Sequence, residues 1–210
     1  MRTFSSLAAY LATSTADGVQ IHQYADSEIS GADLRIRVET SYPWDGTIRV
    51  TVVEAPDCER TISLRVPSWA EGATLNGSPV EAGNAETKRV FAPGDVLELE
   101  VPMPVRQISA NPRVDDVRGE VAFERGPLVY AFEAADQVDS VVLDDVAVAG
   151  AAGTTARTQD LLHGMVGLEV PASLRDLEVG TARTATVAGL PYFAWANRGP
   201  GSMRVWLPTA

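Results

Sequence analysis

Carboxylate pairs of two kinds could do chemistry in this chain: adjacent acids, and acids that end successive strands. Adjacent acids stand at Asp115-Asp116 and Asp144-Asp145, and carboxylate oxygens are the ligands that calcium prefers. Neither pair has the spacing of an EF-hand loop, and paired acids in turns are usually solvated. Glu124 and Glu133 end two short predicted strands and resemble a glycosidase pair, which also requires a cleft between its members. The spacing favours solvated or structural acids over a calcium site or a catalytic pair.

Nucleophiles and metal ligands are sparse. Cys58 is the only cysteine, which excludes an intrachain disulfide and a cysteine-rich zinc site. It stands between Asp57 and Glu59, and we expect it to lack the basic neighbours that activate a thiol. The two histidines, His22 and His163, are not spaced as a ligand pair. The sequence therefore predicts no catalytic residue, no metal site and no cofactor in this chain.

Two tryptophans are candidates for binding rather than for chemistry. Trp44 lies in a Pro-Trp-Asp-Gly turn, and Trp69 follows Pro67-Ser68 at the end of a predicted strand. Aromatic rings on the loops of β-sandwich domains hold sugars by stacking against them. Trp44 and Trp69 are therefore the predicted ligand-binding residues, with carbohydrate as the ligand. The sequence favours the other interpretation, in which both rings close the ends of a sandwich or contact a neighbouring domain.

The charge and hydropathy of the chain limit its partners. A net charge of −11 argues against nucleic acid and against an anionic membrane surface, because both require a basic face. No apolar run approaches the roughly 18 residues of a membrane span, and the first residues do not resemble a signal peptide. We expect a cytoplasmic protein, unless a longer parent carries an export signal upstream.

The elements that must position these residues are strands. Strict alternation of apolar and polar residues predicts antiparallel strands with one solvated face. The clearest are expected at 34–40, 47–53, 61–67, 96–101, 120–124, 127–133, 165–171 and 181–189. Turn signals about every ten residues are typical of sandwiches. The predicted fold is all-β, with two antiparallel β-sandwich domains in tandem at 15–111 and 112–210; one larger continuous β-unit is the alternative.

One short N-terminal α-helix is expected before the strands. Phe4, Leu7 and Leu11 form an apolar stripe at helical spacing within residues 3–13. Such a stripe needs a partner, either the first sandwich or a domain to which the helix belongs.

The last segment, 191–208, carries two of the four tryptophans. Two arms around the loop at 197–201 predict a terminal hairpin, because Gly and Pro are the residues that such a loop requires. Its side chains would alternate between the second sandwich's core and an interface that includes Arg204 and Trp206.

Five segments, taken in order, resemble the C-terminal part of glycoside hydrolase family 127, also known as DUF1680 and typified by bacterial β-L-arabinofuranosidases. They are HQYADSEI at 22–29, LRVPSWAEGATLNG at 64–77, PGDVLELEVPMPVR at 93–106, RGPLVYAFE at 125–133 and PYFAWANRGPGSMRVWLP at 191–208. The resemblance runs nearly the full length of the chain, and only residues 135–165 match poorly.

The resemblance implies a larger parent enzyme that is zinc-dependent. Family members have an N-terminal (α/α)6-barrel catalytic domain followed by two β-sandwich domains. Their nucleophile is a zinc-bound cysteine in a Cys-Cys-Pro-Pro-Asn segment at the end of the barrel, which would precede Met1. The resemblance therefore implies that the expected helix at residues 1–14 is the end of a missing catalytic domain. Cys58 matches none of the family's zinc cysteines, so no catalytic or metal residue is carried over to this chain.

The implied function is that of a non-catalytic C-terminal region, inactive alone, that supports the barrel. Its implied partners are the missing catalytic domain or a subunit that carries it, and a second copy of the chain in a homodimer. The alternative is an autonomous carbohydrate-binding module.

Overall fold

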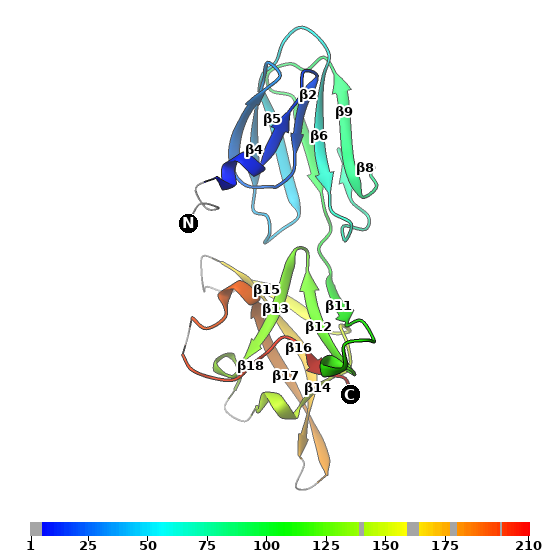
Figure 1. Cartoon of the computed structure of the whole chain (residues 1–210), viewed down its shortest axis with the longest axis vertical. Helices are drawn as coiled ribbons and strands as arrows, with labels where there is room; N and C mark the ends of the chain where they lie inside the picture. Colours follow the sequence, from blue (N-terminus) through cyan, green and yellow to red (C-terminus); the bar gives the residue numbers. More distant parts are fainter. Residues whose placement is uncertain (1–5, 139–140, 159–163, 177–179, 198) are drawn as a thin grey trace. The chain divides into compact units, whose positions relative to one another are not determined.

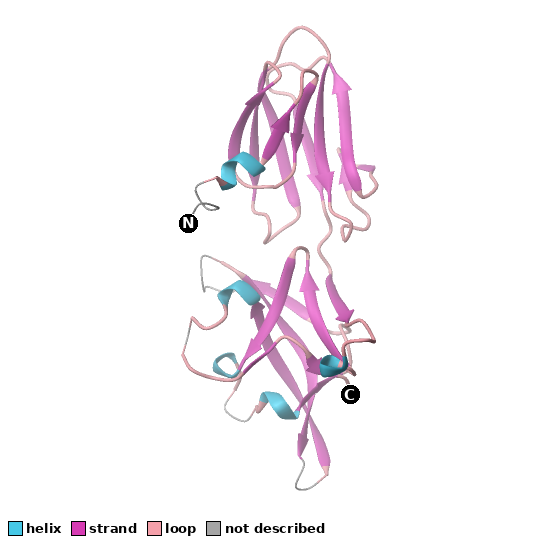
Figure 2. Ribbon diagram, viewed as in Figure 1, coloured by secondary structure: helices cyan, strands magenta, loops and turns pink. Residues whose placement is uncertain are grey.

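Two β-units make up the chain in the computed structural model, which describes residues 6–138, 141–158, 164–176, 180–197 and 199–210. The units are Met1–Met103 and Pro104–Ala210. Within the described ranges the helical elements are short 3-10 turns, and strands dominate both units (Figures 1 and 2). The predicted all-β class is confirmed.

The first unit contains two sheets. The four-stranded sheet has the order β1 (Ala12–Ser14), β2 (Gly18–Ile21), β6 (Arg60–Val66), β9 (Gly83–Arg89). The six-stranded sheet has the order β3 (Ser27–Gly31), β4 (Leu34–Thr40), β5 (Thr47–Glu54), β10 (Val96–Glu100), β7 (Thr74–Leu75), β8 (Ser78–Pro79). Neighbouring strands are antiparallel except β2 and β6, which run parallel.

Alternation along these strands places their apolar side chains in one shared core. Ile62 and Leu64 of the four-stranded sheet are fully buried together with Ile36, Ile48 and Leu99 of the six-stranded sheet. Strand β4 has the bounds that alternation predicts. Because both sheets contribute to one core, the first unit is a β-sandwich.

The α-helix predicted at residues 3–13 is wrong for the part of this segment that the structure describes. Leu7–Tyr10 form a single 3-10 turn, η1, with no buried residue, and Ala12–Ser14 form β1. Strand β1 pairs antiparallel with β2, which satisfies backbone groups along an edge that would otherwise lack partners. This ladder outweighs a weak helical stripe, whose first member, Phe4, lies outside the described residues.

The second unit is built on a nine-stranded sheet. Its main path is β11 (Val105–Ser109), β12 (Glu120–Arg125), β13 (Leu128–Glu133), β17 (Thr181–Pro191), β16 (Val166–Asp176), β14 (Val146–Val148). Strand β15 (Thr155–Thr158) pairs with β16, β18 (Met203–Arg204) with β13, and β19 (Leu207–Pro208) with β12. The connecting 3-10 turns are η2 (Asp115–Val117), η3 (Ala134–Asp136), η4 (Leu143–Asp145) and η6 (Tyr192–Ala194).

The C-terminal residues connect two strands that lie far apart in the order of this sheet, β12 and β14. Leu207 pairs with Val121 of β12, and Thr209 forms a parallel bridge to Val148 of β14. The sheet thereby curls around a core that includes the buried side chains of Phe123, Tyr130, Phe132, Leu143 and Leu168. The sandwich expected for the second domain takes the form of one sheet wrapped around its core.

The junction between the units lies between Met103 and Pro104, whereas the sequence places it between residues 111 and 112. Strand β11 accounts for the difference, because Val105–Ser109 pair with β12 in the second unit.

The terminal hairpin expected at 191–208 does not form. Residues Tyr192–Ala194 make the turn η6, while β18 pairs with β13 and β19 with β12. The two expected arms therefore have different partners. Pairing with β12 and β13 gives the C-terminal residues a place in the main sheet, which a separate hairpin would not.

Candidate functional site

The two predicted ligand-binding tryptophans are half-buried and come from different loops. Trp69 follows β6 and packs against the core of the first unit. Trp44 lies in the turn between β4 and β5, where its backbone N–H donates a 2.8 Å hydrogen bond to the Ser41 carbonyl. Neither indole lines any of the cavities described below. Sugar binding through these two residues stays a prediction.

A cavity of about 260 Å³ in the first unit brings together residues from three segments. We call it the tyrosine pocket; it is lined by His22, Gln23, Tyr24, Tyr42, Pro43, Arg65 and Pro67. The first three residues follow β2, the next two lie in the β4–β5 turn, and the last two come from the end of β6 and the residue after it. This pocket is not visible in the sequence, because its walls come from segments as far apart as His22 and Pro67.

Two tyrosines form the inner wall of this pocket. The buried Tyr24 donates a 2.6 Å hydrogen bond from its hydroxyl to the Arg65 carbonyl. The Tyr24 and Tyr42 rings meet edge to face, with centroids 5.9 Å apart and an interplanar angle of 79°. Burial raises the pKa of both hydroxyls, against the opposing effect of the Arg65 charge. Both tyrosines are therefore neutral near pH 7.

His22 forms part of the polar rim of the pocket. Its Nε2 lies 2.9 Å from the Thr13 hydroxyl oxygen, and its backbone N–H donates a 2.8 Å hydrogen bond to the Leu11 carbonyl. The ring is half-buried. The pairing of β1 with β2 thus fixes the imidazole at the pocket's edge.

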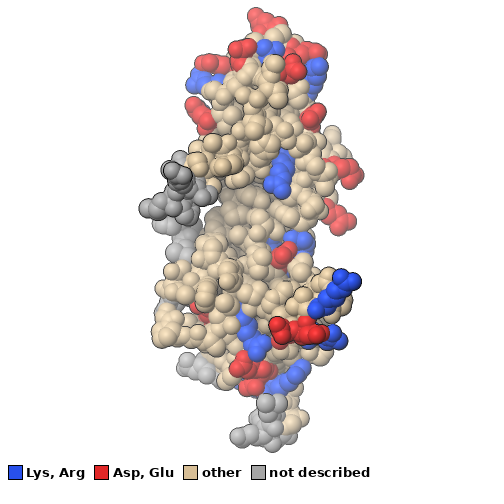
Figure 3. Space-filling model, viewed as in Figure 1, with Lys and Arg blue, Asp and Glu red and all other residues tan. Residues whose placement is uncertain are grey.

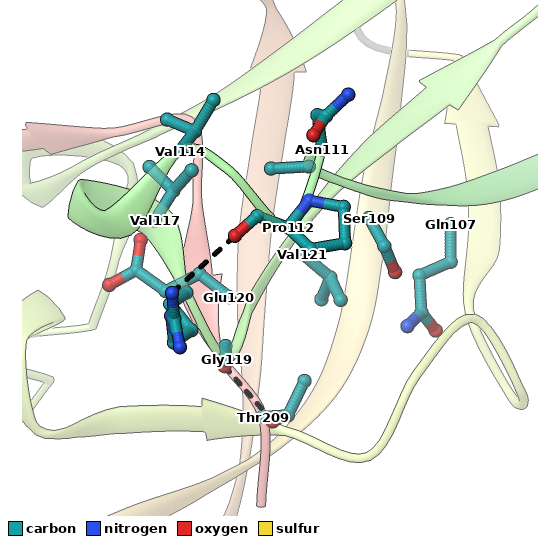
Figure 4. A pocket seen from close by; sticks show the side chains of 12 residues that line it. Gln107, Ser109, Asn111, Pro112, Val114, Val117, Gly119, Glu120, Val121 and Thr209 are labelled. Carbon is teal, nitrogen blue, oxygen red and sulfur yellow. Dashed lines mark hydrogen bonds between the residues drawn. The ribbon is translucent and has the colours of Figure 1, made fainter.

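A second cavity, of about 290 Å³, lies in the second unit (Figure 4). Val114, Val117, Val121 and Pro112 give it apolar walls, whereas Gln107, Ser109 and Asn111 add polar groups. Thr209 donates a 3.0 Å hydrogen bond to the Gly119 carbonyl at its lower edge. This lining contains no aromatic ring and no pair of acids, so its chemistry points to no reaction.

Four of the six acids singled out in the sequence are held by partners rather than poised as a pair. The partners are Arg118 for Asp115, Arg204 for Asp144 at 2.9 Å, Arg106 for Glu124 at 2.8 Å, and the Ala196 amide for Glu133 at 3.0 Å. Glu133 is buried, and its Oε1 accepts that backbone hydrogen bond. These contacts give the four acids structural roles.

The residues present do not fit the zinc site that the resemblance implies for a parent enzyme. Across the described ranges, no group of three or more His, Cys, Asp or Glu could hold a metal ion. Cys58 is exposed. The expectation that it lacks a basic neighbour is wrong, because Arg60 Nη1 donates a hydrogen bond to its Sγ at 2.8 Å. The arginine two positions away along the chain was the missed signal.

Several large apolar side chains are exposed instead of buried. In the second unit, Tyr192, Phe193 and Trp195 are 46%, 59% and 44% exposed. The Tyr192 and Trp195 rings stack, with centroids 5.9 Å apart and planes 24° from parallel. The 3-10 turn η6 creates this contact because it aligns residues three apart. In the first unit, Leu7 and Tyr10 of η1 are 44% and 58% exposed.

Charged side chains of both signs are interspersed on the face drawn in Figure 3. Oppositely charged side chains on neighbouring strands form ion pairs, as Arg49 does with Glu98 at 2.9 Å. Within the described residues, no helix has the length and apolar character needed to cross a bilayer.

Comparisons with known proteins agree on one family. Residues 18–103 match the β-L-arabinofuranosidase GH127 middle domain, and residues 105–208 match the glycoside hydrolase family 127 C-terminal domain. A non-reducing end β-L-arabinofuranosidase of Bifidobacterium longum subsp. longum is 33% identical over 98% of this chain. The match covers 35% of that enzyme.

Solved structures give the same result. A GH127 β-L-arabinofuranosidase from Geobacillus stearothermophilus T6 superposes with a TM-score of 0.90 at 34% identity, over all of this chain and 36% of the other. The GH127 β-arabinofuranosidase BT3674 superposes with a TM-score of 0.85 at 29% identity, over all of this chain and 37% of the other. The chain thus spans little more than a third of the length of these relatives. It belongs to glycoside hydrolase family 127, of which it matches the middle and C-terminal domains.

Proposed function

We propose that this chain is the non-catalytic β-region of a glycosidase related to the β-L-arabinofuranosidases, and that it supports a catalytic domain. One observation carries the proposal: the middle and C-terminal domains of the family account for residues 18–103 and 105–208, yet the chain spans only 35% of the curated relative. The remaining length of the relative supplies the catalytic domain, as part of the same polypeptide or as a separate subunit.

The exposed apolar residues of η1 support a partner for the first unit. Leu7 and Tyr10 belong to one short turn and are both exposed, and adjoining exposed apolar side chains are typical of interaction surfaces. A catalytic domain packed on η1 would cover both side chains.

A graft tests this proposal. The Bifidobacterium relative is truncated before its matching region, and in a second variant this chain replaces the removed part. We expect the truncated enzyme to lose thermal stability and activity on an aryl β-L-arabinofuranoside, and the graft to regain both. In the graft, the double substitution Leu7→Glu and Tyr10→Glu should abolish the regained stability and activity. Val90→Glu, at an exposed position elsewhere in the first unit, should leave both unchanged. A truncated enzyme as stable and active as the whole would contradict the proposal.

We further propose that this chain mediates the association of two copies. The exposed aromatic cluster of Tyr192, Phe193 and Trp195 is an apolar patch of the kind that mediates association of two copies. Light scattering coupled to size exclusion tests it: we expect a dimer that Phe193→Glu converts to a monomer. A monomer at all concentrations would contradict this role.

Carbohydrate binding through Trp44 and Trp69 is the second candidate function. Its support is that both indoles are partly exposed on loops of a β-sandwich. Glycan-array binding that Trp44→Ala or Trp69→Ala abolishes would support it. No binding at millimolar sugar would count against it.

A further inference from the structure

The tyrosine pocket of the first unit combines an aromatic wall with a cation and contains no acid. Its polar lining consists of His22, Gln23, Tyr24, Tyr42 and Arg65, and the remaining two residues are prolines. We propose that it binds a single sugar ring that carries a carboxylate, with the Arg65 guanidinium as the partner of that carboxylate. The inference does not rest on the proposed support of a catalytic domain, because it concerns this chain alone.

The charge of the pocket favours an anion. Arg65 is exposed, and its side chain has no acidic partner among the residues that the structure describes. Its cross-strand neighbour on β9 is the neutral Asn84. In a chain of net charge −11, this leaves a guanidinium free for a ligand, and a guanidinium binds a carboxylate through two parallel hydrogen bonds.

A neighbouring cavity of the same unit shows the contrast. The cavity at the β4–β5 edge is lined by Asp26, Glu39 and Asp45, with Arg49 as its only cation. The backbone amides of Thr40 and Thr47 bond two of these acids internally. Acid-free lining is therefore a property of the tyrosine pocket and not of this unit's cavities in general.

The aromatic wall favours a sugar over a small inorganic anion. The half-buried Tyr42 faces the cavity beside Pro43, with Pro67 contributing a further apolar surface. Aromatic and proline side chains contact the C–H groups of a sugar ring, whereas an inorganic anion gains nothing from them. The cavity volume of about 260 Å³ suits one such ring with its substituents.

The pocket is organised before a ligand arrives. The Tyr24 hydroxyl fixes the backbone of Arg65, and the Tyr24 ring supports Tyr42 edge to face. The contact with Thr13 fixes His22. The Gln23 side chain, exposed at the rim, offers an amide for the ring hydroxyls. A preformed site of this kind binds without a large ordering cost.

Calorimetric titration of the whole 210-residue chain tests the proposal with three probes. D-Galacturonate carries both the ring and the carboxylate, D-galactose lacks the carboxylate, and acetate lacks the ring. We expect D-galacturonate to bind in the millimolar range and each of the other two to bind at least about tenfold more weakly: D-galactose because it loses the charge-assisted pair with Arg65, and acetate because it loses the ring contacts with the aromatic wall. The NMR signals of the His22 ring, assigned by their loss in His22→Asn, should shift on binding.

Matched variants separate the pocket from the overall charge. Arg65→Gln and Arg37→Gln each remove one exposed positive charge from the first unit; Arg37 is paired with Glu28 on the other sheet. We expect Arg65→Gln to weaken D-galacturonate binding about tenfold or more, Arg65→Lys to weaken it less, and Arg37→Gln to leave it unchanged. Far-UV circular dichroism checks that each variant folds.

Three results would overturn the proposal. The first is that D-galacturonate does not bind at tens of millimolar. The second is that Arg65→Gln and Arg37→Gln weaken its binding equally, and the third is that acetate binds as tightly as D-galacturonate. The last would leave a general carboxylate site, of the kind that an acidic side chain of another protein domain fills. None of these results bears on the grafted enzyme, so failure here is distinguishable from failure of the proposed function.

Discussion

The Tyr24 hydroxyl donates a 2.6 Å hydrogen bond to the backbone carbonyl of Arg65, which lies 41 positions further along the chain. This bond ties the segment after β2 to the end of β6. It also holds two walls of the tyrosine pocket at a fixed separation, so the stability of the first unit and the shape of its pocket depend on the same contact.

Removing this hydroxyl should destabilise the first unit. We expect Tyr24→Phe to lower the free energy of unfolding by about 1–2 kcal/mol, because a part-buried carbonyl loses its donor while the ring packing stays. Urea unfolding followed by circular dichroism measures it. Tyr10→Phe, at an exposed position, is the control and should change little; equal stability of Tyr24→Phe and the native chain would contradict the assignment.

Alkaline pH should destabilise the second unit through Tyr130. Its buried hydroxyl donates a 3.0 Å hydrogen bond to the Val166 carbonyl, and burial raises its pKa from 10.0 to about 12. Because its pKa is raised, the hydroxyl loses its proton at lower pH in the unfolded chain than in the folded one. Its contribution to the free energy of unfolding is therefore complete below pH 10 and disappears as the pH rises through about 12. We expect a loss on the order of 2–3 kcal/mol over this interval.

Tyr130→Phe checks the origin of that loss. The variant should start less stable at neutral pH and show a shallower decline above pH 10, as measured by urea unfolding at several pH values. An equally steep decline in the variant would show that other groups cause it.

Gly46 should not tolerate a side chain. A Cβ added there would lie 1.9 Å from the Val101 carbonyl oxygen, and the Gly46 carbonyl itself accepts a 2.9 Å hydrogen bond from the Val101 N–H. Gly46→Ala therefore forces the backbone at position 46 away from Val101, and we expect the free energy of unfolding to fall by more than about 2 kcal/mol. Gly201→Ala is the matched control, because its Cβ would meet only ordinary contacts from 3.5 Å outward. Equal melting temperatures for the two variants would contradict the close approach.

The last eight residues should be essential to the second unit. Deleting 203–210 removes β18 and β19 and with them the bridge from Thr209 to Val148. The buried Leu207 also leaves the core. We expect the second unit to lose cooperative unfolding, as followed by hydrogen exchange of β12 and β14, while deletion of Ala210 alone should have a small effect. Unchanged protection after the long deletion would refute the closure of the sheet.

The strands were predictable because their signal is local. Alternation in 34–40 reflects a core on one face and water on the other, and this pattern is visible within seven residues. The family was accessible for a similar reason, since its resemblance is carried by short segments in a fixed order. The matches at 18–103 and 105–208 confirm it.

The errors lie where distant partners decide the local structure. Residues 12–14 join β2 instead of a helix because the edge of β2 offers hydrogen bonds, and residues 203–208 join β12 and β13 rather than the chain just before them. The tyrosine pocket depends on Tyr24, Tyr42 and Arg65 meeting across two strand connections. No pattern within a short segment of the sequence reports such a meeting.

Hydrolysis of an aryl β-L-arabinofuranoside, measured for this chain alone and for the grafted enzyme, with and without added zinc, tests the central claim most directly. A non-catalytic supporting region predicts no turnover above buffer by the chain alone under either condition, and turnover restored by the graft relative to the truncated enzyme. Turnover by the 210-residue chain alone would contradict it.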